Sequence, residues 1–302
     1  RGYDADLATG AIAAGGTLGI LIPPSITMIL YGIASETSIG RLFIAGIIPG
    51  LLLTALFMAW ALFLSWKRGT VLVDSDRIYT LKEKLELLPR LLPFIVVIIG
   101  VVYALYGGIA TPSEAAGVGA MLCLLMVMVI YRVWRPMELW VILRAGLCES
   151  GMLLLIIGAS ILFGYMMSSL QVTQSVAESI AAMQVNKWVV FAAINLLLLV
   201  AGMFLPPAAI ILMTTPILMP VITAAGFDPI WFGVVLTINM ELGLITPPVG
   251  LNLFVINGIC PDVKLPTILK GALPFMGCMV VAILLLCVFP GLATWLPAKV
   301  MG

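Results

Sequence analysis

The sequence contains no histidine and few charged side chains: Asp, Glu, Lys and Arg together make up 10% of its 302 residues. Its five cysteines show neither CxxC spacing nor a histidine partner, so the usual zinc and redox motifs are missing. It also offers no nucleophile beside a base and no carboxylate pair inside an apolar segment, which argues against a membrane-embedded enzyme. A net charge of +1, with no basic cluster interleaved with aromatics, argues against nucleic-acid binding.

Apolar residues are abundant and make up 63% of the chain. This fraction exceeds that of soluble domains and predicts an all-α polytopic protein embedded in a lipid bilayer. A helix needs about 20 mostly apolar residues to cross the ~30 Å hydrocarbon core. Runs without Asp, Glu, Lys or Arg, each a candidate span, cover residues 42–66, 91–113, 115–131, 150–177, 188–227, 242–261 and 271–298, and a further span is expected over 11–35.

Two candidate spans are interrupted by the same pattern, LGILIPP at 18–24 and LGLITPP at 242–248. A proline removes a backbone donor and clashes with the preceding turn, so each pair leaves carbonyl groups that need another partner in lipid. Paired interruptions in two halves of a chain indicate the binding site of a secondary transporter. The alternative is a pair of kinks packed against neighbouring helices.

The run over 188–227 would extend about 60 Å as one helix, roughly twice the hydrocarbon core. It contains Pro206, Pro207 and Pro216, so it must break or turn back. We expect a helix over 188–204, an unwound joint over 205–208 and a second arm over 209–224.

Residues 150–183 are also interpreted as a re-entrant segment. Gly158, Ser160 and Gly164 interrupt its first part, and its second part is weakly amphipathic.

Polar stretches separate the apolar runs. Residues 66–90 end in leucines and charges at helical spacing, which predicts a linker helix lying along the membrane interface. Residues 135–149 and 261–270 resemble shorter arms of the same kind. Six Lys and Arg in 66–90 and three in 132–144 place both stretches on the cytoplasmic side by the positive-inside rule. Beyond Glu149 the topology depends on which interrupted segments cross, and it stays open.

Residues 111–114 (TPSE) form a capping-box pattern. Thr111 is the expected N-cap, Pro112 the first helical residue, and Glu114 reaches back to a free backbone N–H. Glu114 is therefore interpreted as a helix cap and not as a coupling site.

Oxygen donors surround the first and the last interruption. A hard cation such as sodium is bound by several oxygens, which loosened backbone carbonyls and Ser, Thr or Asn side chains supply without a full charge in lipid. The alternative is that the hydroxyls bond back to their own helices and the glycines allow close packing. The candidate cation-binding residues are Thr17, Gly19, Ser25, Thr246, Gly250 and Asn252.

Helical arms that start after Pro24, Pro207 and Pro248 expose N-terminal amides, where the macrodipole favours an anion. Each interruption would then present carbonyls to a cation and amides to a carboxylate. Glu241 is an acid inside a central span and is a functional hypothesis by default: it could help bind a cation or pair with a positive group, but it could equally lie near the interface. The candidate substrate-binding residues are Pro24, Thr27, Pro207, Ala208, Pro248, Asn239 and Glu241.

Four blocks, in this order, resemble the large membrane subunit of the tripartite ATP-independent periplasmic (TRAP) transporters. They are AAGGTLGILIPPSI at 13–26, ATPSEAAGVGA at 110–120, GMFLPPAAIILMTTPILMPV at 202–221 and NMELGLITPPVGLNLFV at 239–255. The resemblance implies a multi-pass bacterial inner-membrane transporter of the elevator type, built from two inverted repeats with broken helices and re-entrant hairpins. It further implies sodium as coupling ion, no other cofactor, and a small organic-acid anion as substrate. The implied partners are a small membrane subunit and a soluble periplasmic substrate-binding protein.

Carried over by position, the motifs place sodium at Thr17, Gly19, Ser25, Thr246 and Gly250. Pro206 departs from the family, in which we expect a polar or acidic residue before the following proline. The family's first helices and its upstream Ser/Gly-rich segment would precede Arg1, so an N-terminally incomplete chain is expected. The resemblance divides the chain into transport-domain segments (1–40 and 150–260), scaffold helices (41–65 and 91–135), the interfacial linker (66–90), an arm helix (136–149) and an arm with a terminal scaffold helix (261–302).

Two rival functions are also compatible with the sequence. A stand-alone sodium-coupled dicarboxylate or citrate symporter would transport without a soluble binding protein. A scaffolding subunit would use its broken helices only for packing, and would show neither solute binding nor a sodium effect on stability.

Overall fold

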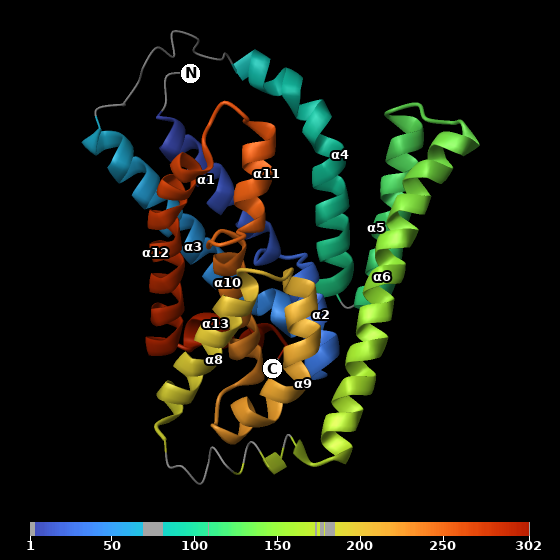
Figure 1. Ribbon diagram of the computed structural model, residues 1–302. Coiled ribbons are helices and arrows are strands. Elements are labelled where there is room, and N and C mark those ends of the chain that lie inside the picture. Colours follow the sequence, from blue (N-terminus) through green and yellow to red (C-terminus); the bar gives the residue numbers. More distant parts are fainter. Residues whose placement is uncertain are drawn as a thin grey trace. The chain divides into compact units, whose positions relative to one another are not determined.

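The computed structural model describes residues 4–68, 81–107, 109–172, 174–175, 178 and 185–301. These residues are mainly helical, and no strand occurs among them (Figure 1). Five of the described helices are long and apolar enough to cross a membrane, which confirms the predicted all-α polytopic membrane protein. The chain divides into two compact units: unit 1 comprises Arg1–Val71 and Ile156–Gly302, and unit 2 comprises Leu72–Leu155.

Unit 1 contains two broken helices at the predicted diproline sites. Residues 21–25 separate the first pair of arms, and Ser25 caps the second arm by accepting a hydrogen bond from the Met28 N–H (3.2 Å). Residues 245–250 separate the other pair. Both Pro-Pro bonds, at 23–24 and at 247–248, are cis. The arms are α1 (Ala5–Thr17) with the short 3₁₀ turn η1 (Leu18–Ile20), α2 (Ile26–Ser35), α10 (Pro229–Leu244) and α11 (Leu251–Ile259).

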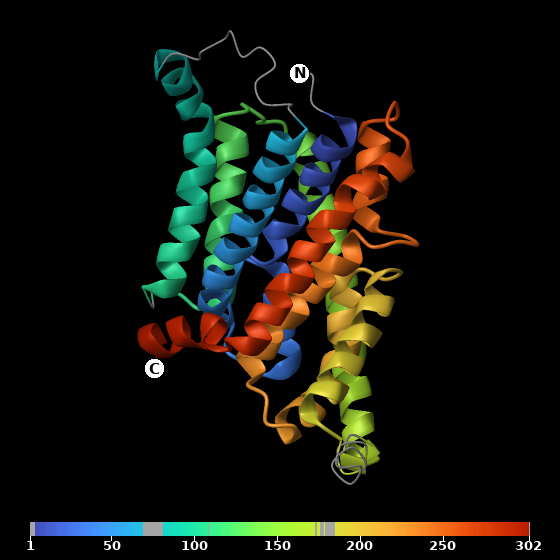
Figure 2. The same ribbon diagram turned by 90° about the vertical axis from the view of Figure 1, so that its left-hand side faces the viewer.

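The long run over 188–227 turns back instead of crossing. Helices α8 (Lys187–Gly202) and α9 (Pro207–Ala224) lie in the same half of unit 1 in both ribbon views, joined at mid-height by residues 203–206 (Figures 1 and 2). This hairpin bears out the expected interruption, two residues earlier than the predicted joint at 205–208. Because Pro207 opens α9, it occupies a first-turn position where its missing N–H costs nothing.

Hydrogen bonds identify the two ends of unit 1. At one end Arg68, which follows α3 (Ile39–Lys67), pairs with Asp6 at the start of α1. At the other end the Tyr31 hydroxyl of α2 donates to the Pro229 carbonyl at the start of α10 (2.7 Å). The broken helix α1–α2 therefore runs from the first end to the second, and α10–α11 runs in the opposite direction.

Helix α1 packs along α12 (Leu265–Val288), which is followed by α13 (Gly291–Met301). Helix α12 begins inside the stretch interpreted as an arm (261–270) and ends before 298, the expected end of the span. Pro290 accounts for the early end, since the residue before a proline is pushed out of the helical region. Helices α3 and α12, which the sequence-based division places in the scaffold, lie in unit 1 with the broken helices.

Unit 2 contains α4 (Leu81–Tyr106) packed against α5 (Pro112–Val129). The predicted capping box is confirmed: Thr111 Oγ1 accepts from the Glu114 N–H (3.4 Å), and Glu114 Oε2 accepts from the Thr111 N–H (2.8 Å). Of the predicted interfacial linker, residues 69–80 lie outside the described residues. Its last part is not a separate helix, because α4 continues without a break past residue 90.

Helix α6 (Pro136–Ser169) runs unbroken for 34 residues. The interpretation of Gly158, Ser160 and Gly164 as interruptions is therefore wrong. Within unit 1 two of these small residues pack against α9 instead: the Ser160 hydroxyl donates to the Leu212 carbonyl, and Gly164 lies against Pro216. Pro216 has no N–H with which to satisfy that carbonyl four residues earlier, so Ser160 takes over the missing backbone bond.

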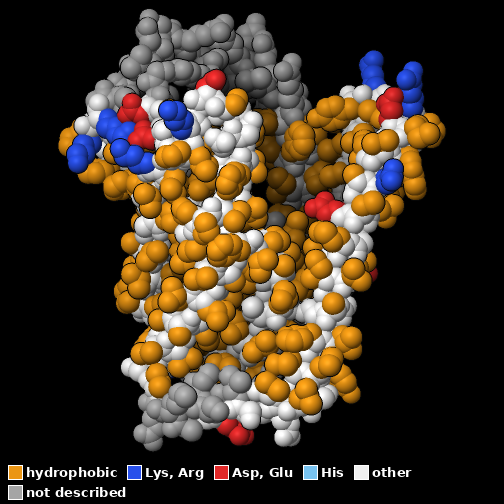
Figure 3. Space-filling model, in the orientation of Figure 1, with side chains coloured by type: hydrophobic (Ala, Val, Ile, Leu, Met, Phe, Trp, Pro, Cys, Tyr) orange, Lys and Arg blue, Asp and Glu red, His pale blue; other side chains and the backbone are white. Residues whose placement is uncertain are grey.

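On the face shown in Figure 3, hydrophobic side chains cover most of the surface, as expected for a protein surrounded by lipid. On this face a cluster of Lys, Arg, Asp and Glu side chains lies at the end of unit 1 where α1 and α12 begin and α3 ends.

Candidate functional site

The ends of three helices meet in the middle of unit 1. A Cβ atom placed on Gly243, near the end of α10, would lie 2.8 Å from the Gly202 Cα at the end of α8, so the two backbones touch. Thr17, the last residue of α1, lies against Glu241 of α10. The first interruption, the hairpin tip and the last interruption therefore meet around the end of α10, although they come from distant parts of the sequence.

Glu241 is fully buried. Its Oε2 atom lies 3.5 Å from Thr17 Oγ1, at the outer limit of a hydrogen bond. Its Oε1 atom has no hydrogen-bond partner among the described residues. Thr17 uses its own proton to donate to the Ala14 carbonyl (2.8 Å). The pair thus brings three oxygen atoms together, and the described residues donate few hydrogen bonds to them.

At the first interruption, the buried Ser25 side chain has two backbone partners. Its hydroxyl donates to the Ile20 carbonyl and accepts from the Met28 N–H. Thr27 is also buried, whereas Gly19 and Pro24 are exposed. Thr17, Gly19 and Ser25 therefore flank one interruption, but the Ser25 oxygen serves first as the cap of α2.

At the last interruption, Thr246 donates its hydroxyl proton to the Leu242 carbonyl (2.5 Å). Gly250 adopts a left-handed conformation (φ 55°) and is the N-cap of α11, a position for which glycine is suited. Asn252 is half-buried, and Pro248 is exposed. The predicted residues again surround the interruption, with the Thr246 proton already committed to its own helix.

Asn239 faces a different neighbour from Glu241. Its Nδ2 donates to the Asn195 carbonyl (2.9 Å) and to Asn195 Oδ1 (3.0 Å) on α8, and its buried Oδ1 has no partner among the described residues. Pro207 and Ala208 open α9, which packs along α2. The structure thus assigns Asn239 to the seam between α8 and α10, and Glu241 to the contact with α1. Neither Gly202 nor Asn195 is among the predicted site residues, because no local pattern tells which helix each one meets.

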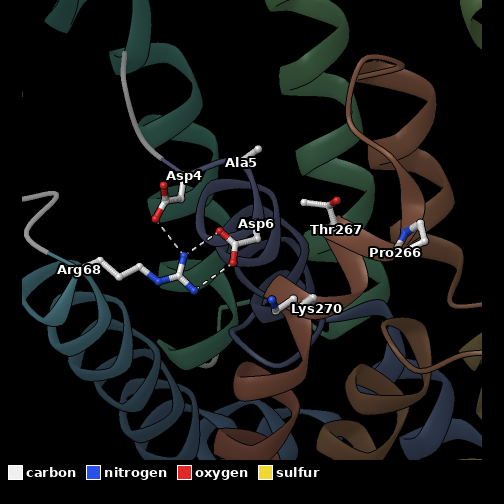
Figure 4. A pocket seen from close by; sticks show the side chains of 7 residues that line it. All are labelled: Asp4, Ala5, Asp6, Arg68, Pro266, Thr267 and Lys270. Atoms are coloured by element: carbon white, nitrogen blue, oxygen red, sulfur yellow. Dashed lines mark hydrogen bonds and ion pairs between the residues drawn. The ribbon is translucent and has the colours of Figure 1, made fainter.

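A separate depression of about 610 Å³ opens at the far end of α1, lined by Asp4, Ala5, Asp6, Arg68, Pro266, Thr267 and Lys270 (Figure 4). Arg68 binds Asp6 through both terminal nitrogens (2.8 and 3.0 Å) and Asp4 through one (2.9 Å). The Arg68 guanidinium holds the pKa of Asp6 below its usual value. Because α1 has 13 residues, this depression lies about 20 Å from the first interruption. It belongs to the charged end of unit 1 and not to the predicted site.

Two oppositely directed broken helices, with a hairpin tip and a buried acid between them, define a membrane transport protein. Comparison with protein-family models matches residues 1–292 to the "Tripartite ATP-independent periplasmic transporter, DctM component". The chain belongs to this family, as its sequence motifs predict. It is a multi-pass protein of the bacterial inner membrane.

Curated relatives extend over almost the whole chain. It is 37% identical to the "C4-dicarboxylate TRAP transporter large permease protein DctM" of Pseudomonas aeruginosa, over 98% of this chain and 68% of that protein. It is 34% identical to the "Sialic acid TRAP transporter large permease protein SiaM" of Vibrio cholerae, over 99% of this chain and 69% of that protein. It is 33% identical to the "C4-dicarboxylate TRAP transporter large permease protein DctM" of Vibrio cholerae, over 100% of this chain and 70% of that protein. These names of transporter permeases agree with the expectation that the chain is not an enzyme.

Proposed function

We propose that this chain moves an organic-acid anion across the inner membrane and couples that movement to a sodium gradient. The observation that carries the proposal is the meeting of three interrupted backbone segments around a buried carboxylate and hydroxyl in unit 1. The names of the relatives support the substrate class, because both C4-dicarboxylates and sialic acid carry carboxylates.

The cation side of the site consists of helix C-termini. Helices α1, α8 and α10 all end at the interruptions, and the last carbonyls of a helix carry the negative end of its dipole. The donors near them are oxygens, as a hard cation requires. Sodium would be held by backbone oxygens together with members of the predicted set Thr17, Gly19, Ser25, Thr246, Gly250 and Asn252.

The anion side consists of the N-termini of α2, α9 and α11. The backbone N–H groups of Thr27, Ala208 and Asn252 lie in first turns, and they have no hydrogen-bond partner among the described residues. Such amides, at the positive end of the helix dipole, bind a carboxylate but make no contacts that distinguish the rest of the substrate. This agrees with relatives named for different substrates, and it gives Pro24, Pro207 and Pro248 the role of opening the amide-bearing arms.

The orientation in the membrane follows from the same residues. The positive-inside rule puts the Arg68 end of unit 1 in the cytoplasm. The hairpin α8–α9 then enters from the periplasmic side. Helix α6 is unbroken, so a single crossing from the cytoplasmic stretch at 132–144 would bring Ser169 to the periplasmic side.

The proposal includes an elevator movement and two partners, a small membrane subunit and a soluble periplasmic binding protein. The family description, a tripartite periplasmic transporter, supports the partners. The apolar and largely exposed surfaces of α5 and α6 are suited to cover by lipid or by a membrane subunit. A stand-alone symporter is the rival, and uptake without a binding protein would favour it.

The test is uptake of a C4-dicarboxylate and of sialic acid by the complete transporter in proteoliposomes. The binding protein, the small subunit and the sodium gradient are left out in turn. We expect uptake to require all three, and Ser25→Ala and Thr246→Ala to raise the sodium concentration that it needs. Uptake that persists without a sodium gradient would reject the coupling. An unchanged sodium requirement in either variant would reject that residue as a ligand.

A further inference from the structure

The carboxyl group of Glu241 is poorly satisfied for a group with no exposed surface. One oxygen has only the 3.5 Å contact to Thr17, and the other has no partner among the described residues. A buried carboxylate is normally matched by a cation or by several hydrogen-bond donors, because losing its hydration is costly. The missing partner of Glu241 must therefore come from something other than the described side chains.

No described lysine or arginine fills this role. Helices α1, α2, α9 and α11 carry neither residue type. The basic side chains on the other helices around α10 lie toward helix ends. Arg41 donates to the Met301 carbonyl, Lys187 lies over Trp188 and Lys299 lies over Trp295. Lys67 is the last residue of α3, and Lys270 of α12 lines the charged depression at the far end of α1. Every ion pair in the described part of the chain involves other acids.

The geometry at Thr17 suits a shared cation. Its hydroxyl proton points to the Ala14 carbonyl, which leaves the oxygen lone pairs for another partner. Two oxygens that bind one cation at about 2.4 Å, in neighbouring octahedral positions, lie about 3.4 Å apart. The observed separation between Thr17 Oγ1 and Glu241 Oε2 is 3.5 Å. A good hydrogen bond between two such oxygens would be shorter, near 2.7 Å.

We propose that Glu241 is a direct ligand and the countercharge of one sodium ion, with Thr17 as a neighbouring ligand. This deepens the proposed function and rests on it. Glu241 then leaves the substrate-binding set, because a carboxylate facing an organic-acid anion would repel it. With its ion bound, the site carries no net charge, which lowers the cost of keeping it inside the membrane.

The test is sodium-dependent thermal stabilisation of the purified complete transporter. NaCl is titrated against choline chloride at constant ionic strength, with no substrate present. Glu241→Gln keeps the shape and removes the charge, so we expect the half-maximal sodium concentration to rise on the order of a hundredfold. Thr17→Val removes one neutral ligand and should raise it about tenfold. Thr54→Val is the matched control, because Thr54 also donates to a carbonyl of its own helix but lies on α3, and it should leave the midpoint unchanged.

An unchanged sodium midpoint in Glu241→Gln would overturn the assignment. If that variant does not fold, Thr17→Val decides, and an unchanged midpoint there overturns the shared site. Absence of any sodium effect on the wild-type protein, in both stabilisation and uptake, would instead reject sodium coupling itself.

Discussion

The contact between Gly202 and Gly243 makes the hairpin tip sensitive to a single methyl group. In Gly243→Ala the new Cβ would lie 2.8 Å from the Gly202 Cα, and 2.9 and 3.0 Å from its carbonyl carbon and oxygen. Carbon atoms pack at about 3.5–4.0 Å, so α8 would have to move by about 1 Å. These are backbone atoms and cannot rotate away. We expect a destabilisation of about 1–3 kcal/mol, the usual cost of overpacking.

Alanine variants of two further glycines serve as comparisons for the destabilisation expected in Gly243→Ala. The Cβ of Gly202→Ala would lie 3.2 Å from the Gly243 Cα, so this variant should be the milder of the two. Gly277, inside α12, has nothing within 4 Å of an added Cβ. Gly277→Ala should therefore be stabilising by about 0.5–1 kcal/mol, because alanine loses less backbone entropy in a helix.

The assay is unfolding of the purified transporter, combined with uptake kinetics in proteoliposomes. Moving the tip displaces the start of α9 relative to the last interruption, so Gly243→Ala should raise the substrate KM. Gly277→Ala should leave KM unchanged. If Gly243→Ala matches Gly277→Ala in both stability and KM, then the two backbones do not touch and the meeting of the three segments is refuted.

Three other perturbations test the supporting structure. Ser160→Ala should cost about 1–3 kcal/mol of unfolding free energy, because a buried carbonyl loses its donor. Adding Pro216→Ala to Ser160→Ala should recover most of this lost unfolding free energy, because alanine at position 216 restores the helical N–H that the Leu212 carbonyl needs. A double variant no more stable than Ser160→Ala would contradict this explanation. Thr111→Ala should cost about 1 kcal/mol in the same measurement by removing a helix cap; a cost near zero would contradict the capping role. The pKa of Asp6 is lowered in the folded protein from its usual 3.8, so the stability due to its ion pair is present above that value and is lost as pH falls through the lower folded value. We therefore expect the unfolding free energy of Arg68→Gln, measured over a series of pH values, to fall less steeply at low pH than that of the wild-type protein. An unchanged slope would contradict the role of the Asp6–Arg68 ion pair.

Local sequence predicted the features that have local causes. Proline pairs cannot continue a helix, so both broken helices and the hairpin joint were expected within a few residues of their observed places. The capping box at Thr111 needs only residues on either side of a helix start. These features do not depend on which helices become neighbours.

The remaining features depend on distant neighbours. Gly164 looked like an interruption, yet it makes room for Pro216, which would lie 3.1 Å from an added Cβ. Small residues serve breaks and close packing alike, and the sequence does not distinguish the two. The pairing of Thr17 with Glu241 joins positions 224 residues apart, and nothing near either residue indicates it.

The bond between Ser160 and the Leu212 carbonyl has a consequence for how such proteins diverge. Pro216 in α9 and the Ser160 hydroxyl on α6 depend on each other through this bond, although the two bonded residues lie 52 positions apart in the chain. In a relative that has replaced the proline, the serine is no longer needed as a donor and can be replaced without loss of stability. A relative that loses the serine first, while it keeps the proline, is less stable because the Leu212 carbonyl has no donor. Aligned relatives should therefore show the two positions changing together, in that order.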